Sequence, residues 1–230
     1  MLDELRNDVL AANLALPAHG LVTLTWGNAS GVDREAGLMA IKPSGVSYDA
    51  MTADDVVLVS LQSGEVVEGE RRPSTDTPTH LTLYRAFDEI GGIVHTHSTW
   101  ATAWAQAGRE IPLLGTTHAD LCAVAVPITR GLTAEEVERD YEGATGDAVI
   151  EALSTSGAAE VPCVLVRGHA PFCWGRSPAA AVETAVTLEE VAKMALLTSV
   201  LERDPPLLDT FVRDKHFMRK HGPSAYYGQR

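Results

Sequence analysis

The sequence predicts a single mixed α/β domain, and three observations lead to this fold class. A chain of 230 residues is long enough to bury one sizeable core without help from disulfides. Segments with helical spacing and short apolar runs alternate along the chain, with no repeat, low-complexity linker or change in composition between them. Turn signals between neighbouring apolar runs indicate hairpins, which argue against a purely parallel sheet. We therefore expect one domain over residues 1–230.

Helix and strand signals alternate in the first half of the chain. Apolar side chains at helical spacing predict a first helix over residues 2–16, and Gly20 supplies its stop. A Thr-Pro pair opens a second helix over residues 77–87, because proline fits the first turn of a helix. The turn at residues 62–64 joins two of the expected strands into a hairpin. Short apolar runs predict strands at residues 21–24, 38–41, 56–61, 65–67 and 93–97.

The second half of the chain is expected to be mostly helical. Ser98 is a candidate cap for one helix, and Thr133 with Glu136 matches a capping box at the start of another. A proline after Ser177 marks the start of a long helix, which ends near Asp204. These signals predict helices over residues 99–107, 133–153, 177–204 and 207–220, and strands near residues 123–127 and 161–166.

The composition is that of an ordinary globular protein, with 45% hydrophobic and 21% charged residues. The 18 basic and 31 acidic residues give a net charge of −13, which disfavours binding to nucleic acids or anionic membranes. An anionic substrate must therefore be held by local cations and backbone amides. We expect neither a nucleic-acid nor a membrane partner.

Several features lead us to expect a cytoplasmic protein. The chain begins with acidic residues in an amphipathic pattern, not with a basic segment followed by an apolar run. Its apolar stretches are far shorter than the roughly 20 residues needed to cross a bilayer. The three cysteines, Cys122, Cys163 and Cys173, form no C-x-x-C pair, and we expect Cys173 to be a small buried thiol.

Three histidines are candidate metal ligands. His95 and His97 alternate along an expected strand, so their side chains leave the same face, separated by two rises of about 3.3 Å. Two such imidazoles can each reach a zinc ion at about 2.0–2.1 Å, and His169 in a Gly-His-Ala-Pro turn is available as a third neutral ligand. The His-x-His pattern alone is equally compatible with paired surface or packing histidines. We expect no functional role for His19, His80, His118 and His221.

Three segments rich in glycine and hydroxyl side chains are candidate phosphate-binding loops. They cover residues 25–31, 42–45 and 73–77, and the last of them precedes an expected helix N-terminus. Backbone N–H groups and short hydroxyls can approach oxyanions closely in such loops. Each segment alone is also compatible with an ordinary turn. The combination of all three with Lys42 favours a phosphate site.

The chain resembles a known family over nearly its whole length. The resemblance rests on the segments LTWGNASGVD, IKPSGVSYD, GEVVEG, PSTDTPTH, GGIVHTHSTWATAWAQAG, GTTHAD, GHAPFCWG and DKHFMRKHGPSAYYGQ. These segments are similar to those of the class II aldolase family, and within it to the L-ribulose-5-phosphate 4-epimerases. The resemblance implies a three-layer α-β-α domain with a mostly antiparallel central sheet. It also implies a cyclic homotetramer whose active sites lie between neighbouring subunits.

The resemblance implies a metal site and a set of substrate contacts. It implies one zinc ion (Zn2+) per subunit, bound by His95, His97 and His169, with Asp76 beside the metal or on it. The implied substrate is a small sugar phosphate. The residues that the resemblance implies in substrate binding are Gly27, Asn28, Lys42, Ser44, Gly45, Ser74, Thr75 and Asp76.

The resemblance also implies a reaction, in which L-ribulose 5-phosphate and D-xylulose 5-phosphate are interconverted. C4 of this sugar is not adjacent to the carbonyl, so its inversion requires the C3–C4 bond to break and form again. Asp120 and Tyr227 are implied as the proton-transfer groups on the two faces of the released aldehyde, with His216 in a supporting role. The tail, residues 222–230, is implied to contribute to the active site.

Two alternatives remain open. Related class II aldolases carry a glutamate where this chain has Asp76, which favours an epimerase over an aldolase that releases its aldehyde. A non-catalytic metal-binding domain of the same fold is the other alternative, and the retained histidines, Asp120 and Tyr227 argue against it. Thr75 stands where a second serine is more usual, but the hydroxyl is kept. The sequence decides neither between the arabinose and ascorbate pathways nor which divalent metal is loaded in the cell.

Overall fold

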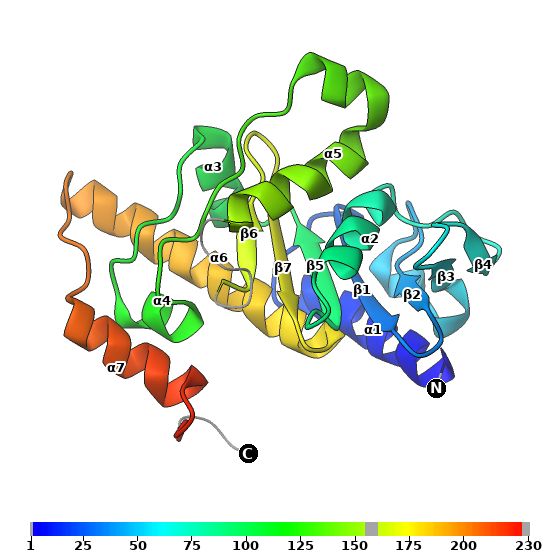
Figure 1. Ribbon diagram of the computed structural model, residues 1–230, viewed down its shortest axis with the longest axis horizontal. Helices are drawn as coiled ribbons and strands as arrows, with labels where there is room; N and C mark the ends of the chain where they lie inside the picture. Colours follow the sequence, from blue (N-terminus) through cyan, green and yellow to red (C-terminus); the bar gives the residue numbers. More distant parts are fainter. Residues whose placement is uncertain (1, 155–160, 227–230) are drawn as a thin grey trace.

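The computed structural model describes residues 2–154 and 161–226, which form a seven-stranded sheet with helices on both faces (Figure 1). The strands are β1 (Gly27–Asp33), β2 (Leu38–Ile41), β3 (Val57–Ser60), β4 (Val66–Glu68), β5 (Gly92–Thr96), β6 (Cys163–Leu165) and β7 (Pro171–Gly175). The helices are α1 (Leu2–Ala18), α2 (Thr77–Ala86), α3 (Thr99–Ala107), α4 (Thr116–Leu121), α5 (Ala134–Ser154), α6 (Pro178–Leu201) and α7 (Thr210–His221).

The strands pair antiparallel in the order β4-β3-β2-β1-β5-β7-β6. Helices α1 and α6 cover one face of the sheet, and α2 and α5 cover the other (Figure 1). Strand β1 shows the alternation between the faces, because the Ser30 hydroxyl bonds to His80 and Tyr84 of α2. A Cβ atom on the next residue, Gly31, would lie 2.8 Å from Pro178 of α6. The predicted mixed fold with a mostly antiparallel sheet is therefore confirmed.

Local capping signals explain why most helices were predictable. At the start of α6, the hydroxyl of Ser177 accepts the N–H of Ala180 at 3.2 Å. At α5 the predicted capping box is present, with the Glu136 carboxylate 2.8 Å from the N–H of Thr133. The N–H of Glu136 in turn donates to the Thr133 hydroxyl at 3.2 Å.

Helix α3 covers the predicted residues, but the prediction of its cap is wrong. The Ser98 side chain makes no capping hydrogen bond. Instead, the carboxylate of Glu189 in α6 accepts the N–H groups of Trp100 and Ala101 at 2.8 and 2.9 Å. A side chain from a distant helix therefore accepts the first N–H groups of α3, for which a local acceptor was expected.

The strand predicted at residues 21–24 does not form, and a strand occurs where a loop was expected. Leu24 has a positive φ of 55° and is exposed, so the chain turns at this residue. Strand β1 begins three residues later, inside the candidate phosphate-binding segment 25–31. Its small residues have low strand propensity, but only small residues fit close to α1 and α6, as the contact at Gly31 shows. Tertiary packing overrides local propensity here.

Two further elements are absent from the sequence-based prediction, namely α4 and β7. The residues of β7 follow a Gly-His-Ala-Pro turn, and its Phe172 and Trp174 are buried. The strand predicted near residues 123–127 is reduced to a single bridge between Ile111 and Val126.

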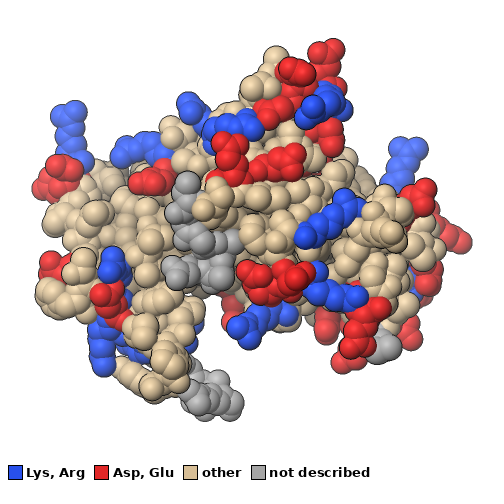
Figure 2. All heavy atoms as spheres, viewed as in Figure 1, with Lys and Arg blue, Asp and Glu red and all other residues tan. Residues whose placement is uncertain are grey.

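The surface carries acidic and basic side chains together, with acidic groups gathered over the first half of α5 (Figure 2). Among the residues described, no helix combines the length and apolar character needed to cross a bilayer. The three cysteines are unpaired and buried, as expected for Cys173.

Candidate metal centre and substrate cavity

Three histidines come together on the face of the sheet that carries α2 and α5. His95 lies in β5 opposite Asn28 of β1, and His97 follows directly after the strand. His169 lies in the turn before β7, where Gly168 adopts a positive φ of 75°. The nitrogen atoms that the three histidines offer all lie within 4.8 Å of one another. The expected convergence of the three imidazoles is found.

The spacing of these nitrogens fits a bound metal ion. The Nε2 atoms of His97 and His169 lie 3.2 Å apart. Two nitrogens on one tetrahedral zinc ion lie about 3.3 Å apart, because each Zn–N bond is about 2.0–2.1 Å long. His95 Nδ1 lies 2.9 Å from the carbonyl oxygen of Pro171, to which it can donate, and its Nε2 is then free for a metal. Three imidazoles and a fourth open position form a donor set of catalytic zinc sites.

Burial keeps the imidazoles of His97 and His169 neutral near neutral pH. Burial, with the neighbouring His95 and His97, lowers the pKa of His169 to about 4, although Asp76 opposes the shift. Burial and the proximity of His95 also lower the pKa of His97. Because neutral imidazole is the form that binds metal, these two ligands need release no proton on metal binding at neutral pH.

Asp76 lies beside the histidine cluster at the N-terminus of α2. Its Oδ2 atom accepts a hydrogen bond from Asn28 Nδ2 at 2.6 Å. Burial raises the pKa of this carboxyl, but His95, His80 and the bond from Asn28 outweigh burial and hold the pKa below its ordinary value. A carboxylate is therefore present next to the candidate cation site.

One cavity of about 540 Å³ joins the histidine cluster to the three glycine- and hydroxyl-rich segments. These segments are far apart in the sequence, and the sheet and the N-terminus of α2 bring them together. All of the residues expected to contact substrate line this cavity, namely Gly27, Asn28, Lys42, Ser44, Gly45, Ser74, Thr75 and Asp76.

Lys42 is the buried cation of the cavity. Its side chain is 2% exposed, and Nζ donates to the carbonyl oxygens of Val46 at 2.8 Å and Pro43 at 3.2 Å. Burial lowers its pKa. None of the ion pairs found among residues 2–154 and 161–226 includes Lys42. Because a buried ammonium group without a counter-ion is costly, this environment favours an anionic ligand.

Asn28 connects the candidate phosphate site to the candidate metal site. Its Nδ2 atom donates to the Ser74 hydroxyl at 3.0 Å as well as to Asp76. Its Oδ1 atom is buried and has no hydrogen-bond partner within the described structure. An orphaned buried acceptor at a cavity wall is the arrangement expected where a ligand hydroxyl donates.

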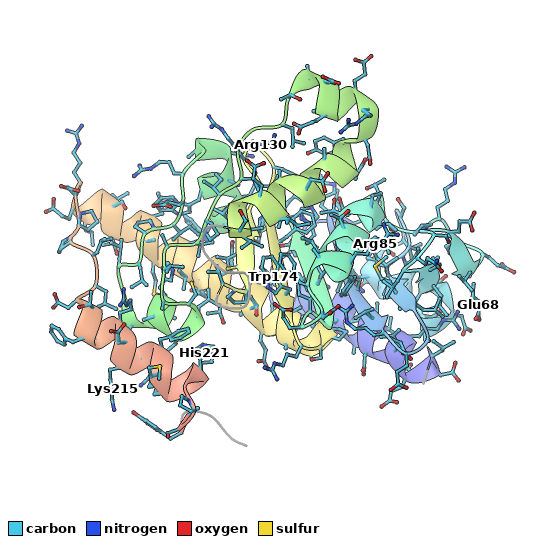
Figure 3. All side chains as sticks on the ribbon, in the orientation of Figure 1. Glu68, Arg85, Arg130, Trp174, Lys215 and His221 are labelled. Carbon is cyan, nitrogen blue, oxygen red and sulfur yellow. The ribbon has the colours of Figure 1, made fainter. Side chains whose placement is uncertain are left out.

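Asp120 and His216 lie elsewhere in the chain. The Asp120 carboxylate in α4 bonds to Arg219 of α7 at 2.7 and 3.0 Å and to His216 Nδ1 at 3.2 Å. Figure 3 labels His221 on the same helix, and its Nε2 lies 2.8 Å from the backbone oxygen of Asp120. Asp120 lines a second cavity, with no lining residue in common with the first. Tyr227 lies outside the described residues, and of the expected proton-transfer groups only the place of Asp120, away from the histidine cavity, is described.

Two residues that line the cavity lie outside every segment predicted to be functional, namely Tyr141 and Glu142. Both follow a kink in α5 at Asp140, where φ is −168° and ψ is 84°. The sequence predicts an unbroken helix in this region. Gly143 is the one signal that could have indicated the break, because glycine is a poor helix former.

Comparisons with known proteins extend this description. Residues 7–196 match the family described as Class II Aldolase and Adducin N-terminal domain. An L-fuculose 1-phosphate aldolase superposes with a TM-score of 0.79 at 25% identity, covering 94% of this chain and 95% of the other. The L-fuculose-1-phosphate aldolase of Thermus thermophilus gives 0.68 at 25% identity, with 89% and 98% covered. YgbL of Escherichia coli shares the fold, with a TM-score of 0.73, 23% identity, and 94% and 99% covered.

Proposed function

Because this chain belongs to the class II aldolase and adducin N-terminal domain family, we propose that it is a metal-dependent enzyme that acts on a sugar phosphate. Within the family, we propose the epimerase reaction that interconverts L-ribulose 5-phosphate and D-xylulose 5-phosphate. The observation that carries this proposal is one cavity lined by both the three-histidine cluster and the buried Lys42 side chain. A cation site and an anion site in one cavity suit a small phosphorylated sugar.

The proposed reaction breaks a carbon–carbon bond. C4 of the substrate is not adjacent to the carbonyl carbon C2, so loss of its C–H proton would leave an unstabilised carbanion. Loss of the proton on the C4 hydroxyl instead lets the C3–C4 electron pair move onto C3, which yields glycolaldehyde phosphate from C4 and C5 and the enediolate of dihydroxyacetone from C1 to C3. Addition to the other face of the aldehyde group of glycolaldehyde phosphate, followed by return of the proton to oxygen, gives the inverted C4.

We propose that His95, His97 and His169 hold one zinc ion per subunit, with Asp76 beside it or bound to it. When bound, zinc supplies Lewis-acid stabilisation of the negative charge that develops on the cleaved substrate. The chain contributes neutral imidazoles, and the Pro171 carbonyl orients one of them.

The phosphate group is proposed to bind at Lys42, where the hydrogen-bond acceptors of the buried ammonium are backbone carbonyls. Hydroxyl and backbone N–H groups of the surrounding loops complete the site. Anchoring the phosphate keeps the released glycolaldehyde phosphate in the cavity while its aldehyde group turns to present the other face. The residues proposed around the substrate are Gly27, Asn28, Ser44, Gly45, Ser74 and Thr75.

We assign proton transfer to Asp120 and Tyr227, with His216 in support, at a site shared between subunits of a cyclic homotetramer. The tail, residues 222–230, would then reach the histidine cluster of a neighbour. Exposed apolar side chains on α6 and α7, including Leu201 at 89% and Phe211 at 72% exposure, support an interface in this part of the molecule.

The test is an assay of purified protein of known metal content on L-ribulose 5-phosphate. We expect D-xylulose 5-phosphate to form while free glycolaldehyde phosphate stays far below it. Activity should disappear with a chelator and return with Zn²⁺. Stoichiometric zinc without turnover would instead indicate a non-catalytic metal-binding domain.

An aldolase is the second candidate function, and the similarity to an L-fuculose 1-phosphate aldolase favours it. Asp76 is one methylene shorter than the glutamate that the resemblance places at this position in aldolases, which favours the epimerase. The discriminating measurement is accumulation of the two cleavage products, which are glycolaldehyde phosphate and dihydroxyacetone from L-ribulose 5-phosphate, or a free aldehyde and dihydroxyacetone phosphate from L-fuculose 1-phosphate. Such accumulation at the rate of substrate loss would identify an aldolase.

A further inference from the structure

A tyrosine outside the predicted site contacts the histidine cluster. The Tyr141 hydroxyl oxygen lies 3.3 Å from His169 Nδ1, and the two ring centroids are 6.1 Å apart. The other nitrogen of the same imidazole, Nε2, faces His97 at 3.2 Å. The His169 ring therefore has one nitrogen directed toward the candidate metal site and one toward Tyr141.

The proton on His169 fixes the direction of this hydrogen bond. A neutral imidazole that offers Nε2 to a metal carries its proton on Nδ1. The Nδ1–H group then donates, and the Tyr141 oxygen accepts. His95 has the same arrangement, with its Nδ1 atom 2.9 Å from the Pro171 carbonyl oxygen. Such partners fix the tautomer and the ring orientation of a ligating histidine.

Tyr141 is suited to this acceptor role because its hydroxyl oxygen has lone pairs and also carries a proton. The hydroxyl can therefore accept from His169 and still donate its own proton within the cavity that it lines.

We propose that Tyr141 is a positioning residue of the metal centre, which holds His169 in the tautomer and orientation that present Nε2 to the metal. This inference rests on the proposed metal centre and adds a residue to it. Tyr141 acts through His169, so its effect should appear first in metal affinity and in the geometry of the bound metal.

The kink in α5 places Tyr141. The helix breaks at Asp140, whose carboxylate accepts the N–H of Gly143 at 3.1 Å. Asp140 therefore acts as the N-cap of a second helical segment, and Tyr141 lies in the first turn of that segment. The Thr145 hydroxyl donates to the backbone oxygen of Tyr141 at 2.8 Å, which ties this turn together.

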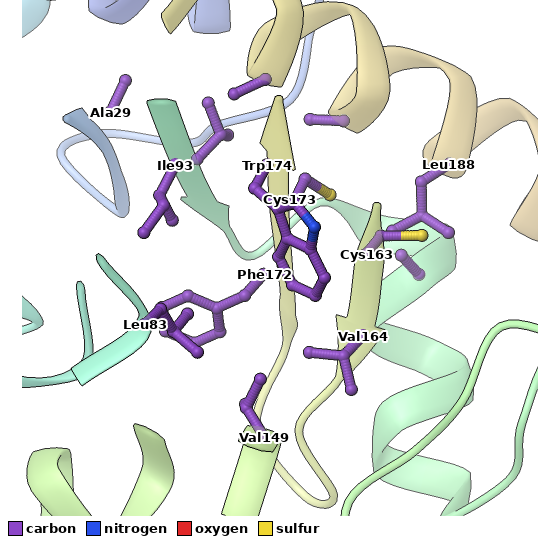
Figure 4. Packing of buried hydrophobic residues seen from close by; sticks show 14 of the residues in the cluster. Ala29, Leu83, Ile93, Val149, Cys163, Val164, Phe172, Cys173, Trp174 and Leu188 are labelled. Carbon is purple, nitrogen blue, oxygen red and sulfur yellow. The ribbon is translucent and has the colours of Figure 1, made fainter. Parts of the chain in front are cut away.

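The second segment of α5 is fixed against α2 and the sheet. The hydroxyl of Thr79 in α2 donates to the backbone oxygen of Glu142 at 2.7 Å. Gly146 permits close approach of the two helices, because a Cβ atom there would lie 2.7 Å from Thr82. Further along, Val149 belongs to the same buried cluster as Phe172 (Figure 4). The Tyr141 hydroxyl is thus presented by an anchored backbone.

The test compares zinc affinity in three variants of the full chain. Tyr141→Phe removes only the hydroxyl, and His169→Asn removes a proposed ligand. Ser154→Ala is the matched control, because it removes a hydroxyl at the far end of the same helix, which donates to the backbone oxygen of Glu151 at 2.7 Å. Each metal-free protein is titrated with Zn²⁺ against a chromophoric chelator, its melting temperature is measured, and the visible spectrum of its Co²⁺ form is recorded.

We expect Tyr141→Phe to bind zinc roughly 10–100-fold more weakly, the range typical for loss of a partner of a ligating histidine. Its Co²⁺ spectrum should change, while the melting temperature of the metal-free form stays close to that of the wild type. Ser154→Ala should keep wild-type affinity and spectrum.

Unchanged affinity and spectrum in Tyr141→Phe would overturn the inference, and so would an equal loss in Ser154→Ala, because the effect would then belong to the helix. A wild-type chain that binds zinc no better than His169→Asn would overturn the metal centre and this inference together. Tight wild-type binding without epimerase or aldolase turnover would remove only the proposed reaction, and the comparison of variants would still decide the role of Tyr141.

Discussion

At the residue scale, the two charged groups proposed to act on substrate have opposite environments. Lys42 is buried, and its ammonium group contacts two carbonyl oxygens and lies over the Tyr48 ring without an acidic partner in the described part of the chain, so its charge is unneutralised until an anion enters. Asp120 already has its counter-ion. Burial raises the pKa of Asp120, but the Arg219 guanidinium and His216 outweigh burial and hold it below the ordinary value. Asp120 is therefore ionised at neutral pH and is suited to begin a cycle as a base.

The environment of Lys42 leads to a prediction about substrate binding. We expect Lys42→Met to raise KM by roughly 10–100-fold with a smaller change in kcat, because a charge-assisted contact contributes about 1.5–3 kcal/mol to binding of the phosphate end. Lys193→Met is the control, since that lysine lies near Trp100 and away from the cavity. Steady-state kinetics measures both. An unchanged KM in Lys42→Met would place the phosphate elsewhere.

The environment of Asp120 leads to a prediction about proton transfer. We expect Asp120→Asn to keep zinc and near-normal KM but to lose kcat by roughly 10²–10⁴-fold. Because the substitution also weakens a pair with Arg219, a matched control is needed. Glu136→Gln alters a similar carboxylate–arginine pair, with Arg130, at the surface. Equal losses in both variants, or none in Asp120→Asn, would contradict the catalytic assignment.

The residues that could be predicted are those whose chemistry depends on local spacing. His95 and His97 share a face because strands alternate, and that alternation is visible in the sequence. Tyr141 could not be predicted, because its contact with His169 depends on a kink at Asp140. The position of Asp120 in a separate cavity also has no sequence signal, since it depends on how α7 packs against α4.

At the element scale, helices were easier to predict than the central strands. Helices α5 and α6 carry their start signals in their own first residues. Strand β1 carries no such signal. Its glycine and small polar residues fit close packing against segments that lie far away in the sequence. Gly31 faces Pro178, and Gly27 faces the end of β5. Pairing between segments far apart in the sequence, and not local strand propensity, therefore determines where β1 forms.

The close approach at Gly27 leads to a prediction for the element that carries Asn28. A Cβ atom at Gly27 would lie 2.8 Å from Val22 and 2.9 Å from the backbone oxygen of His95, and φ is 135°. We expect Gly27→Ala to lower the free energy of unfolding by about 2–3 kcal/mol, since clash and strain add together. Metal affinity should fall too, because β1 must move relative to His95, which is a proposed metal ligand.

Gly37→Ala is the control for this prediction. Gly37 also has a positive φ, of 67°, but a Cβ atom there would meet nothing within 4 Å. Strain alone should cost about 1 kcal/mol at Gly37, with no change in metal affinity. Urea unfolding and zinc titration measure the two quantities. Equal effects of the two substitutions would show that the contact with β5 is unimportant.

At the scale of the whole molecule, stability should depend on pH through histidines that are buried neutral. Burial lowers the pKa of His118 to about 4, and its Nε2 lies 3.0 Å from the backbone oxygen of Val124. The pKa in the unfolded chain is about 6.5. Below that pH the unfolded chain binds more protons than the folded one, so folding is weakened as the pH falls.

The prediction is a loss of stability between about pH 6.5 and pH 4. The contribution of His118 to the free energy of unfolding is complete above pH 6.5. It should fall by about 2 kcal/mol by pH 5, at about 1.4 kcal/mol per pH unit. Urea unfolding of the metal-free protein at pH 7.5 and pH 5 measures the change, with His118→Gln as the comparison. A variant with the same pH dependence as the wild type would show that His118 does not carry it.

A shared active site gives a second prediction at this scale. Mixing inactive Tyr227→Phe chains with inactive His97→Asn chains should restore some activity, because certain mixed interfaces contain an intact metal site and an intact tyrosine. Mass spectrometry must first show that subunits exchange. Exchanged oligomers that stay inactive would argue against a site built from two chains.

The strand order has a consequence for how the chain reaches this structure. Strands β1 to β4 join neighbours in sequence, so this part of the sheet can form from local contacts. The pairing of β1 with β5 joins Ser30 to Ile93 and must first close a long loop, which is slow and entropically costly. Asn28 and His95 face each other across that junction. During synthesis the emerging chain therefore has no metal-binding cavity until the two parts of the sheet have met, and metal loading should be among the last events of its maturation.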